Sequence, residues 1–181
     1  MKRIITIALG TLVVSAGAFA QDQAAIDKAL MAAPANQKAT ATVIKWKADG
    51  TYDTLKKGTG ALVCYDKSGM PGQGAVSIEC TLAGNMERAA QNIKMEAMGD
   101  RAKVNAALND AEKDGTRVKP VFGSVWYHLR GMDLEHTSTH MTIAVPGATG
   151  QSLGLPESGK EGKVWVMNPG TSTAHLMTPG E

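Results

Sequence analysis

The segment 121–145 constrains the fold more than any other part of this 181-residue chain, because its apolar and polar residues alternate. A period of two, with β-branched and aromatic residues, is typical of β-strands. It predicts two strands, 121–130 and 136–145, joined by a short loop over 131–135 that carries Gly and Asp. If one face of the sheet is buried, the apolar rows of both strands must lie on that face.

This arrangement places three of the four histidines on the other face, with a tryptophan and an arginine. If Arg130 pairs with His136, then His128 lies opposite Ser138 and diagonal to both other histidines, with Cα atoms roughly 7–8 Å apart. The face is therefore a candidate for ligand binding. Its residues are Trp126, His128, Arg130, His136 and His140.

Three interpretations of this face remain open. We favour a solvated sheet surface on which the histidines bond to Ser and Thr neighbours, and this interpretation needs no cofactor. An organic ligand could instead use Trp126 and Arg130. In a metal site, the set of ligands would be His128, His136, His140 and His175. Met177 shares a face with His175 in an extended strand and would favour copper over zinc.

The first 20 residues have the pattern of an export signal. Lys2 and Arg3 precede a short apolar core over 4–14, and Ala18-Phe19-Ala20 matches a cleavage site. The apolar core is shorter than a membrane-spanning helix requires. We therefore expect a periplasmic or secreted protein that begins at Gln21 and has no membrane span.

Charge and cysteine content narrow the functional classes. Loss of Lys2 and Arg3 lowers the 19 basic residues to 17, which equals the 17 acidic ones. The mature chain then lacks the basic surface of a nucleic-acid-binding protein. Cys64 and Cys80 are predicted to form a disulfide in an oxidising compartment, because their spacing is not that of a metal site.

The remaining patterns predict an α+β fold. The runs 39–47, 51–55 and 60–65 are separated by short loops and indicate an antiparallel meander. Helical spacing over 85–98 and 101–113 predicts two helices inserted before the central hairpin. A C-terminal strand pair follows at 164–167 and 171–178. The chain is thus expected to contain a signal peptide (1–20), an N-terminal helix or arm (21–38) and a single α+β domain (39–181).

Short motifs also occur in a recognisable order. They are W-x-x-D-G at 46–50, G-T-G-x-x-x-C at 58–64, a second Cys, His140-Met141, Leu155-Pro156, W-V-M at 165–167 and G-T-x-x-A-H-L-M at 170–177. In this order the chain resembles a set of secreted bacterial proteins of unknown function, over most of the mature sequence. It departs from the set at Gly60-Ala61-Leu62, where the set has Asn-Gly-Trp. The resemblance implies export and a single module, and it transfers no active site.

The sequence carries no recognised catalytic or nucleotide-binding motif. The P-loop and H-E-x-x-H are missing. A G-x-S-x-G string occurs at 150–154, but it lies in a long Gly-, Pro- and Ser-rich stretch and not at the turn from a strand into a helix that a nucleophile elbow requires. We therefore predict no catalytic residues. The favoured class is a non-catalytic exported module that binds a small molecule, an envelope component or another protein. The alternative is a copper- or zinc-binding protein, or a metalloenzyme, that uses the histidine face.

Overall fold

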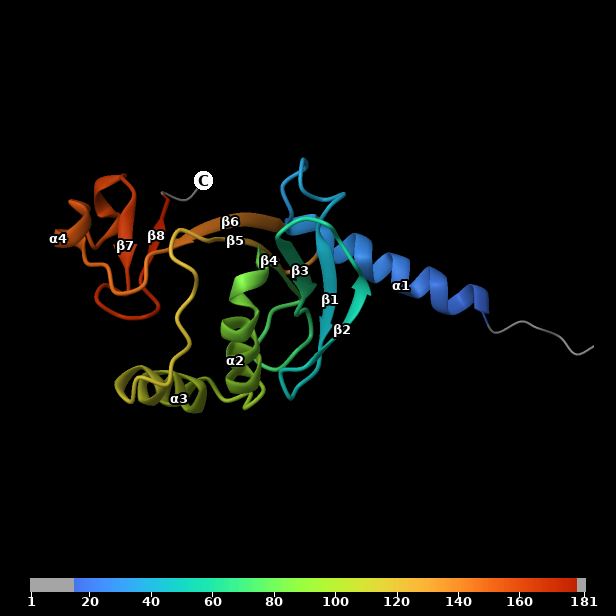
Figure 1. Cartoon of the computed structure of the whole chain (residues 1–181), viewed down its shortest axis with the longest axis horizontal. Helices are drawn as coiled ribbons and strands as arrows, with labels where there is room; N and C mark the ends of the chain where they lie inside the picture. The colour runs from blue at the N-terminus through green and yellow to red at the C-terminus, as the bar shows by residue number, and fades with distance from the viewer. Residues whose placement is uncertain (1–14, 179–181) are drawn as a thin grey trace, which may run out of the picture.

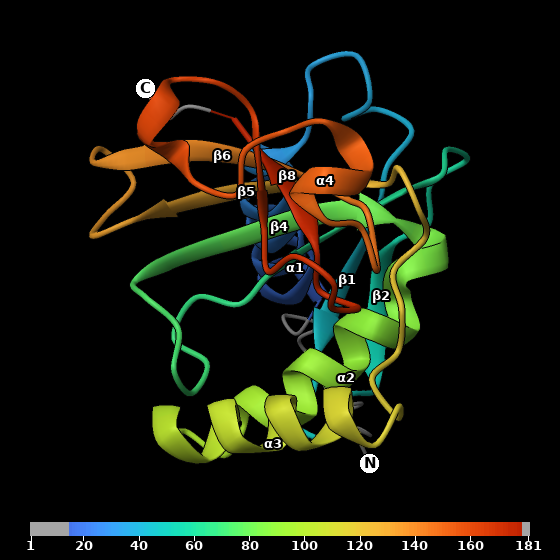
Figure 2. The same ribbon diagram turned by 90° about the vertical axis from the view of Figure 1, so that its left-hand side faces the viewer.

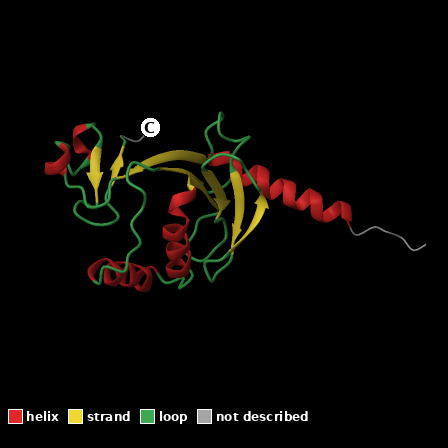
Figure 3. Ribbon diagram, viewed as in Figure 1, coloured by secondary structure: helices red, strands yellow, loops and turns green. Residues whose placement is uncertain are grey.

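The computed structural model of the chain describes residues 15–178, which form one eight-stranded sheet with helices on both faces (Figures 1 and 3). The strand order is β2-β1-β3-β4-β5-β6-β8-β7. The strands are β1 (Thr42–Trp46), β2 (Tyr52–Lys56), β3 (Leu62–Asp66), β4 (Val76–Leu82), β5 (Val125–Gly131), β6 (Thr137–Ala144), β7 (Trp165–Met167) and β8 (His175–Met177). The α-helices are α1 (Ser15–Ala29), α2 (Met86–Glu96), α3 (Arg101–Lys113) and α4 (Gly150–Leu153). Short 3₁₀ turns are η1 (Leu30–Ala32), η2 (Ala83–Asn85) and η3 (Gly159–Glu161).

The α+β class is confirmed, and the predicted two-helix insertion is present between β4 and β5. The predicted meander is wrong in one respect. β3 pairs with β1 in parallel instead of with β2, while every other neighbouring pair is antiparallel. The connection from β2 crosses the start of β1 so closely that a side chain at Gly58 would collide with the backbone of Thr40 and Ala41. Glycine permits this close crossing, and β2 becomes the edge strand.

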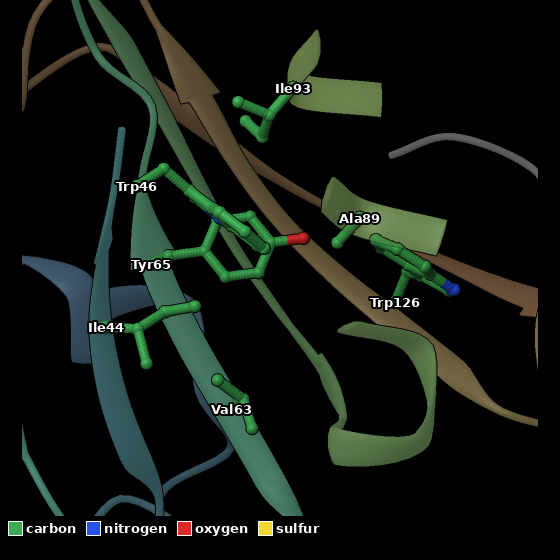
Figure 4. Close-up of a cluster of buried hydrophobic side chains, with 7 residues drawn as sticks. All are labelled: Ile44, Trp46, Val63, Tyr65, Ala89, Ile93 and Trp126. Atoms are coloured by element: carbon green, nitrogen blue, oxygen red, sulfur yellow. The ribbon is translucent and has the colours of Figure 1, made fainter. Parts of the chain in front are cut away.

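Helices lie on both faces of the sheet, so the face that was predicted to be solvated is partly covered. On one face, α2 contributes Ala89 and Ile93 to a cluster over the first strands and β5 (Figure 4). The cluster also contains Ile44, Trp46, Val63, Tyr65 and Trp126. Tyr65 packs edge-on against Trp46, with ring centroids 5.5 Å apart, a favourable aromatic geometry. Trp126 is therefore a core residue as well as a member of the polar row of β5.

The opposite face carries the disulfide and the N-terminal helix. Cys64 and Cys80 lie directly opposite each other in β3 and β4, with their sulfur atoms at bonding distance. The Cys80 sulfur lies 3.8 Å from the carbonyl oxygen of Ala29, the last residue of α1. Segment 21–38 thus contributes to the core through Ala29 and Ala33.

The N-terminal turns of α1 extend beyond the sheet (Figure 1). The predicted signal peptide lies mostly in residues 1–14, outside the part of the chain that the structure describes. Within residues 15–178, no helix is long and apolar enough to cross a membrane.

The C-terminal strands form a small second core of their own. Val145, Val166 and Ala174 are buried there, and β7 and β8 pair as predicted. Polar contacts join this region to the helices. Arg88 of α2 donates to the hydroxyls of Ser172 and Thr173 at 3.2 and 2.9 Å. Figure 2 shows that the loop end of the β5–β6 hairpin extends beyond the rest of the molecule.

Candidate functional site

A cavity of about 540 Å³ lies over the face of the sheet that α2 only partly covers. We call it the histidine cavity, because three of the four histidines line it. They are His128 of β5, His140 of β6 and His175 of β8. Charged side chains contribute the second group of lining residues: Lys67, Glu79, Arg88, Glu96 and Arg130. Trp126, Met167 and Met177 are among its more apolar residues.

A buried carboxylate forms the centre of the charged group. Glu79 is only 4% exposed in the middle of β4. The Tyr65 hydroxyl donates to its Oε2 at 3.1 Å, and the Lys67 ammonium lies 3.0 Å from its Oε1. Lys67 also lies 3.3 Å from Glu96, and Arg130 approaches Glu79 at 3.5 Å. Buried charges require partners of this kind.

The shifts in pKa of these groups favour the charged forms of both Glu79 and Lys67. Burial disfavours the Glu79 carboxylate, but Lys67 and His128 together hold its pKa well below the ordinary 4.5. Burial likewise opposes the charge on Lys67, yet Glu79 and Glu96 raise the pKa of its ammonium. Burial also raises the pKa of Glu96, although Lys67 opposes this effect. Glu79 and Lys67 therefore remain ionised at neutral pH.

Four side chains lie in one row across four adjacent strands. Tyr65 is opposite Glu79, Glu79 is opposite His128, and His128 is opposite His140. The imidazoles of His128 and His140 are stacked, with ring centroids 5.9 Å apart and planes 26° apart. His128 Nδ1 lies 3.3 Å from Glu79 Oε1, a close polar contact without the alignment of a hydrogen bond.

This row corrects the predicted register of the hairpin. Arg130 pairs with Ser138 instead of His136, so His128 lies directly opposite His140 and not diagonal to it. The shift is two residues. A shift of two leaves each side chain on its predicted face, and His128 and His140 do share a face.

The C-terminal strand brings the third histidine to the cavity. His175 of β8 pairs with Ala144 of β6, and Met177 of β8 pairs with Thr142. Both β8 side chains therefore lie on the same face. His175 Nδ1 donates to the Thr173 carbonyl oxygen at 2.7 Å. Burial lowers the pKa of His175, although Thr173 opposes this, and it is also the main cause of the lowered pKa of His140. Both imidazoles are therefore neutral at pH 7, with one ring nitrogen free to accept.

His136 lies outside the cavity. β6 begins at Thr137, so His136 belongs to the hairpin loop. Its Nδ1 lies 2.8 Å from Asp133, and its side chain is 67% exposed. The predicted convergence of His136 with His128 and His140 is wrong, because the loop lies one residue further along the chain than predicted. Gly131 belongs to β5, and His136 belongs to the loop.

The four predicted metal ligands are consequently not gathered at one point. Within residues 15–178, no group of three or more His, Cys, Asp or Glu side chains is arranged to hold a metal ion. His128, His140 and His175 nevertheless line the same cavity, together with Met167 and Met177. A site that uses thioether sulfur would involve a different set of ligands.

Glu79, Lys67 and Glu96 were not identified from the sequence. Glu79 lies in β4, a strand that the sequence analysis did not predict after the Gly- and Pro-rich stretch 68–74. The signal was present, because Ser77, Glu79 and Thr81 alternate with apolar residues. A glutamate in the polar row of a predicted strand 76–82 would have indicated a charged group on the sheet face that carries the histidines.

A second cleft of about 530 Å³ lies on the other face of β5 and β6. Its lining includes Met31 and Pro34 from the N-terminal segment and Tyr127 and Met141 from the hairpin, and it also reaches His128 and His140. No Lys, Arg, Asp or Glu is among the described residues that line it. The histidine cavity therefore differs from it in carrying the concentrated charge. No protein-family model, curated protein or solved structure matches this chain.

Proposed function

We propose that this protein is an exported, non-catalytic binding module, and that the histidine cavity binds a small organic molecule with an acidic group. The observation that carries the proposal is the position of Arg130. Its side chain lines the cavity and is 61% exposed, and among residues 15–178 it has a single long polar contact, of 3.5 Å, to Glu79. Most of its five N–H donors therefore remain available to a ligand, and a guanidinium pairs well with carboxylate or phosphate groups.

The other cations of the cavity are already engaged. Lys67 lies between Glu79 and Glu96. Arg88 donates to the carbonyl oxygen of Val118 at 2.5 Å and to two hydroxyls. Arg130 is accordingly the group that would recognise the acid. Trp126 and the two cavity methionines supply an apolar wall for the remainder of the ligand, as in many small-molecule sites.

Two features support export and a role without covalent catalysis. The N-terminal pattern of residues 1–20 is that of an export signal, and the cysteine pair at bonding distance suits an oxidising compartment. Both cysteines of the chain are used in that pair, so neither supplies a thiol nucleophile. A binding role needs only the cavity and its donors.

The test is a binding screen of the purified protein with small carboxylates, phosphates and neutral analogues, read by ligand-observed NMR. Thr142→Phe places a ring in the cavity, whereas Ser138→Phe adds the same ring on the same strand outside it. Acidic compounds should bind the parent and the Ser138 variant, and lose binding in the Thr142 variant.

Arg130→Ala should weaken acidic compounds at least tenfold and leave neutral analogues unchanged. Arg101→Ala, at an exposed position of α3, is the matched control. Acidic compounds that bind equally well without Arg130 would show that the ligand class is wrong. Compounds that still bind the Thr142 variant would place the site elsewhere.

A further inference from the structure

We propose that His128, His140 and Met177 form a soft-metal site in the histidine cavity and that it takes Cu(I). The inference rests on the proposal that the cavity is a binding site, and it does not require the acidic ligand. Its basis is the stacked pair of imidazoles on adjacent strands, with ring centroids 5.9 Å apart. A thioether on the next strand, in the same cavity, completes the set.

Glu79 prepares His128 for coordination. Metal-binding histidines commonly direct one ring nitrogen to a carboxylate, which leaves the other for the ion and makes it more basic. Here the Glu79 carboxylate faces Nδ1 of His128 at 3.3 Å. That nitrogen otherwise has no hydrogen-bond partner among the described residues. An ion bound at Nε2 would fix the orientation of the ring and leave the proton on Nδ1, where it faces the Glu79 carboxylate.

The register of β8 brings the sulfur ligand. Met177 pairs with Thr142, which lies two residues from His140 on the same face of β6. Met177 is therefore diagonal to His140, with Cα atoms about 7–8 Å apart. Long side chains such as methionine span this distance, and its flexible chain lets the sulfur adapt to an ion.

This set of ligands selects among metals. Zinc requires three or four nitrogen, oxygen or thiolate ligands, and no such group is assembled in residues 15–178. Two imidazoles and a thioether suit Cu(I), a soft ion that accepts three ligands. Metal–nitrogen bonds of about 2 Å require the two ligating nitrogens to approach within about 4 Å. Binding therefore requires that one nitrogen of each ring lies within this distance of the other.

The experiment is an anaerobic competition titration of the purified protein against bicinchoninate, a chromophoric Cu(I) chelator. Ascorbate maintains Cu(I), and a thiol assay confirms that the Cys64–Cys80 disulfide stays intact. We expect one Cu(I) per chain, and X-ray absorption should show sulfur and nitrogen scatterers around the copper. Equimolar Zn(II) should not displace it.

The variants test each ligand against a matched control. His128→Ala, His140→Ala and Met177→Leu should each weaken Cu(I) binding at least tenfold. His136→Ala and Met132→Leu remove the same chemical groups at the exposed hairpin tip and should leave the affinity unchanged. Near-UV circular dichroism establishes that each variant is folded, and Met177→Leu keeps the volume of the side chain.

Two results would overturn the inference. One is the absence of stoichiometric Cu(I) binding by the folded protein. The other is an affinity that the three cavity variants leave unchanged, or that the two tip variants reduce equally. If Cu(I) fails to bind while acidic compounds still require Thr142 and Arg130, only the metal site is refuted. If neither ligand binds, the proposed function falls as well.

Discussion

The ammonium of Lys67 lies 3.0 Å from the carboxylate of Glu79, and both side chains are about 95% buried. Removing one partner of such a pair leaves the other charge buried and poorly compensated. We predict that Glu79→Gln lowers the free energy of unfolding by about 3–5 kcal/mol. Equilibrium urea denaturation measures this loss.

The exposed pair between Lys47 and Asp53, at 2.7 Å, is the control. Solvent screens these charges, so Asp53→Asn should change the stability far less. Equal losses in the two variants would mean that burial of the Glu79 network has no special effect.

The histidine cavity should make stability depend on pH. Burial lowers the pKa values of His140 and His175 below the ordinary 6.5. The unfolded chain therefore takes up protons at a higher pH than the folded protein does. Stability from these groups is complete above about pH 6.5 and is lost as the pH falls through their folded pKa values.

We expect the free energy of unfolding to decrease between about pH 7.5 and pH 5, measured by urea denaturation at each pH. The double variant His140→Gln/His175→Asn should show a smaller decrease. Glu96 contributes with the opposite sign, because its pKa is raised, but it is present in both proteins. Parallel profiles for the two proteins would contradict the prediction.

The alternation of the hairpin predicted which residues share a face, and it could not predict their register. Moving Arg130 from a pairing with His136 to one with Ser138 changes the register by two residues. Every side chain keeps its face after such a shift, so the hydrophobic pattern is equally satisfied. The two registers differ in the position of the loop, which is 131–135 in the predicted register and 132–136 in the structure. His136 carries no apolar or conformational signal that assigns it to the loop.

The sequence-based prediction of the site failed where long-range pairing decides. β4 lies between β3 and β5, so Glu79 meets Tyr65 on one side and His128 on the other. Local periodicity gives no information on which strands are neighbours. The burial of Trp126 beside α2 was missed for the same reason, since Ala89 joins it in the same hydrophobic cluster from a separate segment.

The disulfide should contribute directly to stability. Cys64 and Cys80 close a loop with a sequence separation of 16. We predict that Cys64→Ala/Cys80→Ala lowers the free energy of unfolding by about 2–4 kcal/mol. Urea denaturation with and without reductant measures it. Reductant should destabilise the parent protein and leave the double variant unaffected. An unchanged free energy of unfolding in the fully reduced parent protein would refute the prediction.

The end of α1 should be an integral part of the core. Ala29 is 1% exposed, and its carbonyl oxygen lies 3.8 Å from the Cys80 sulfur. No space remains for a longer polar side chain, so we predict that Ala29→Gln lowers the free energy of unfolding by about 1–3 kcal/mol. Ala24→Gln introduces the same side chain at an exposed position of the same helix, where the change should stay within about 0.5 kcal/mol. Thermal denaturation of the two variants provides the comparison. Similar stabilities would mean that α1 leaves the sheet in solution, because only a docked helix distinguishes the two positions.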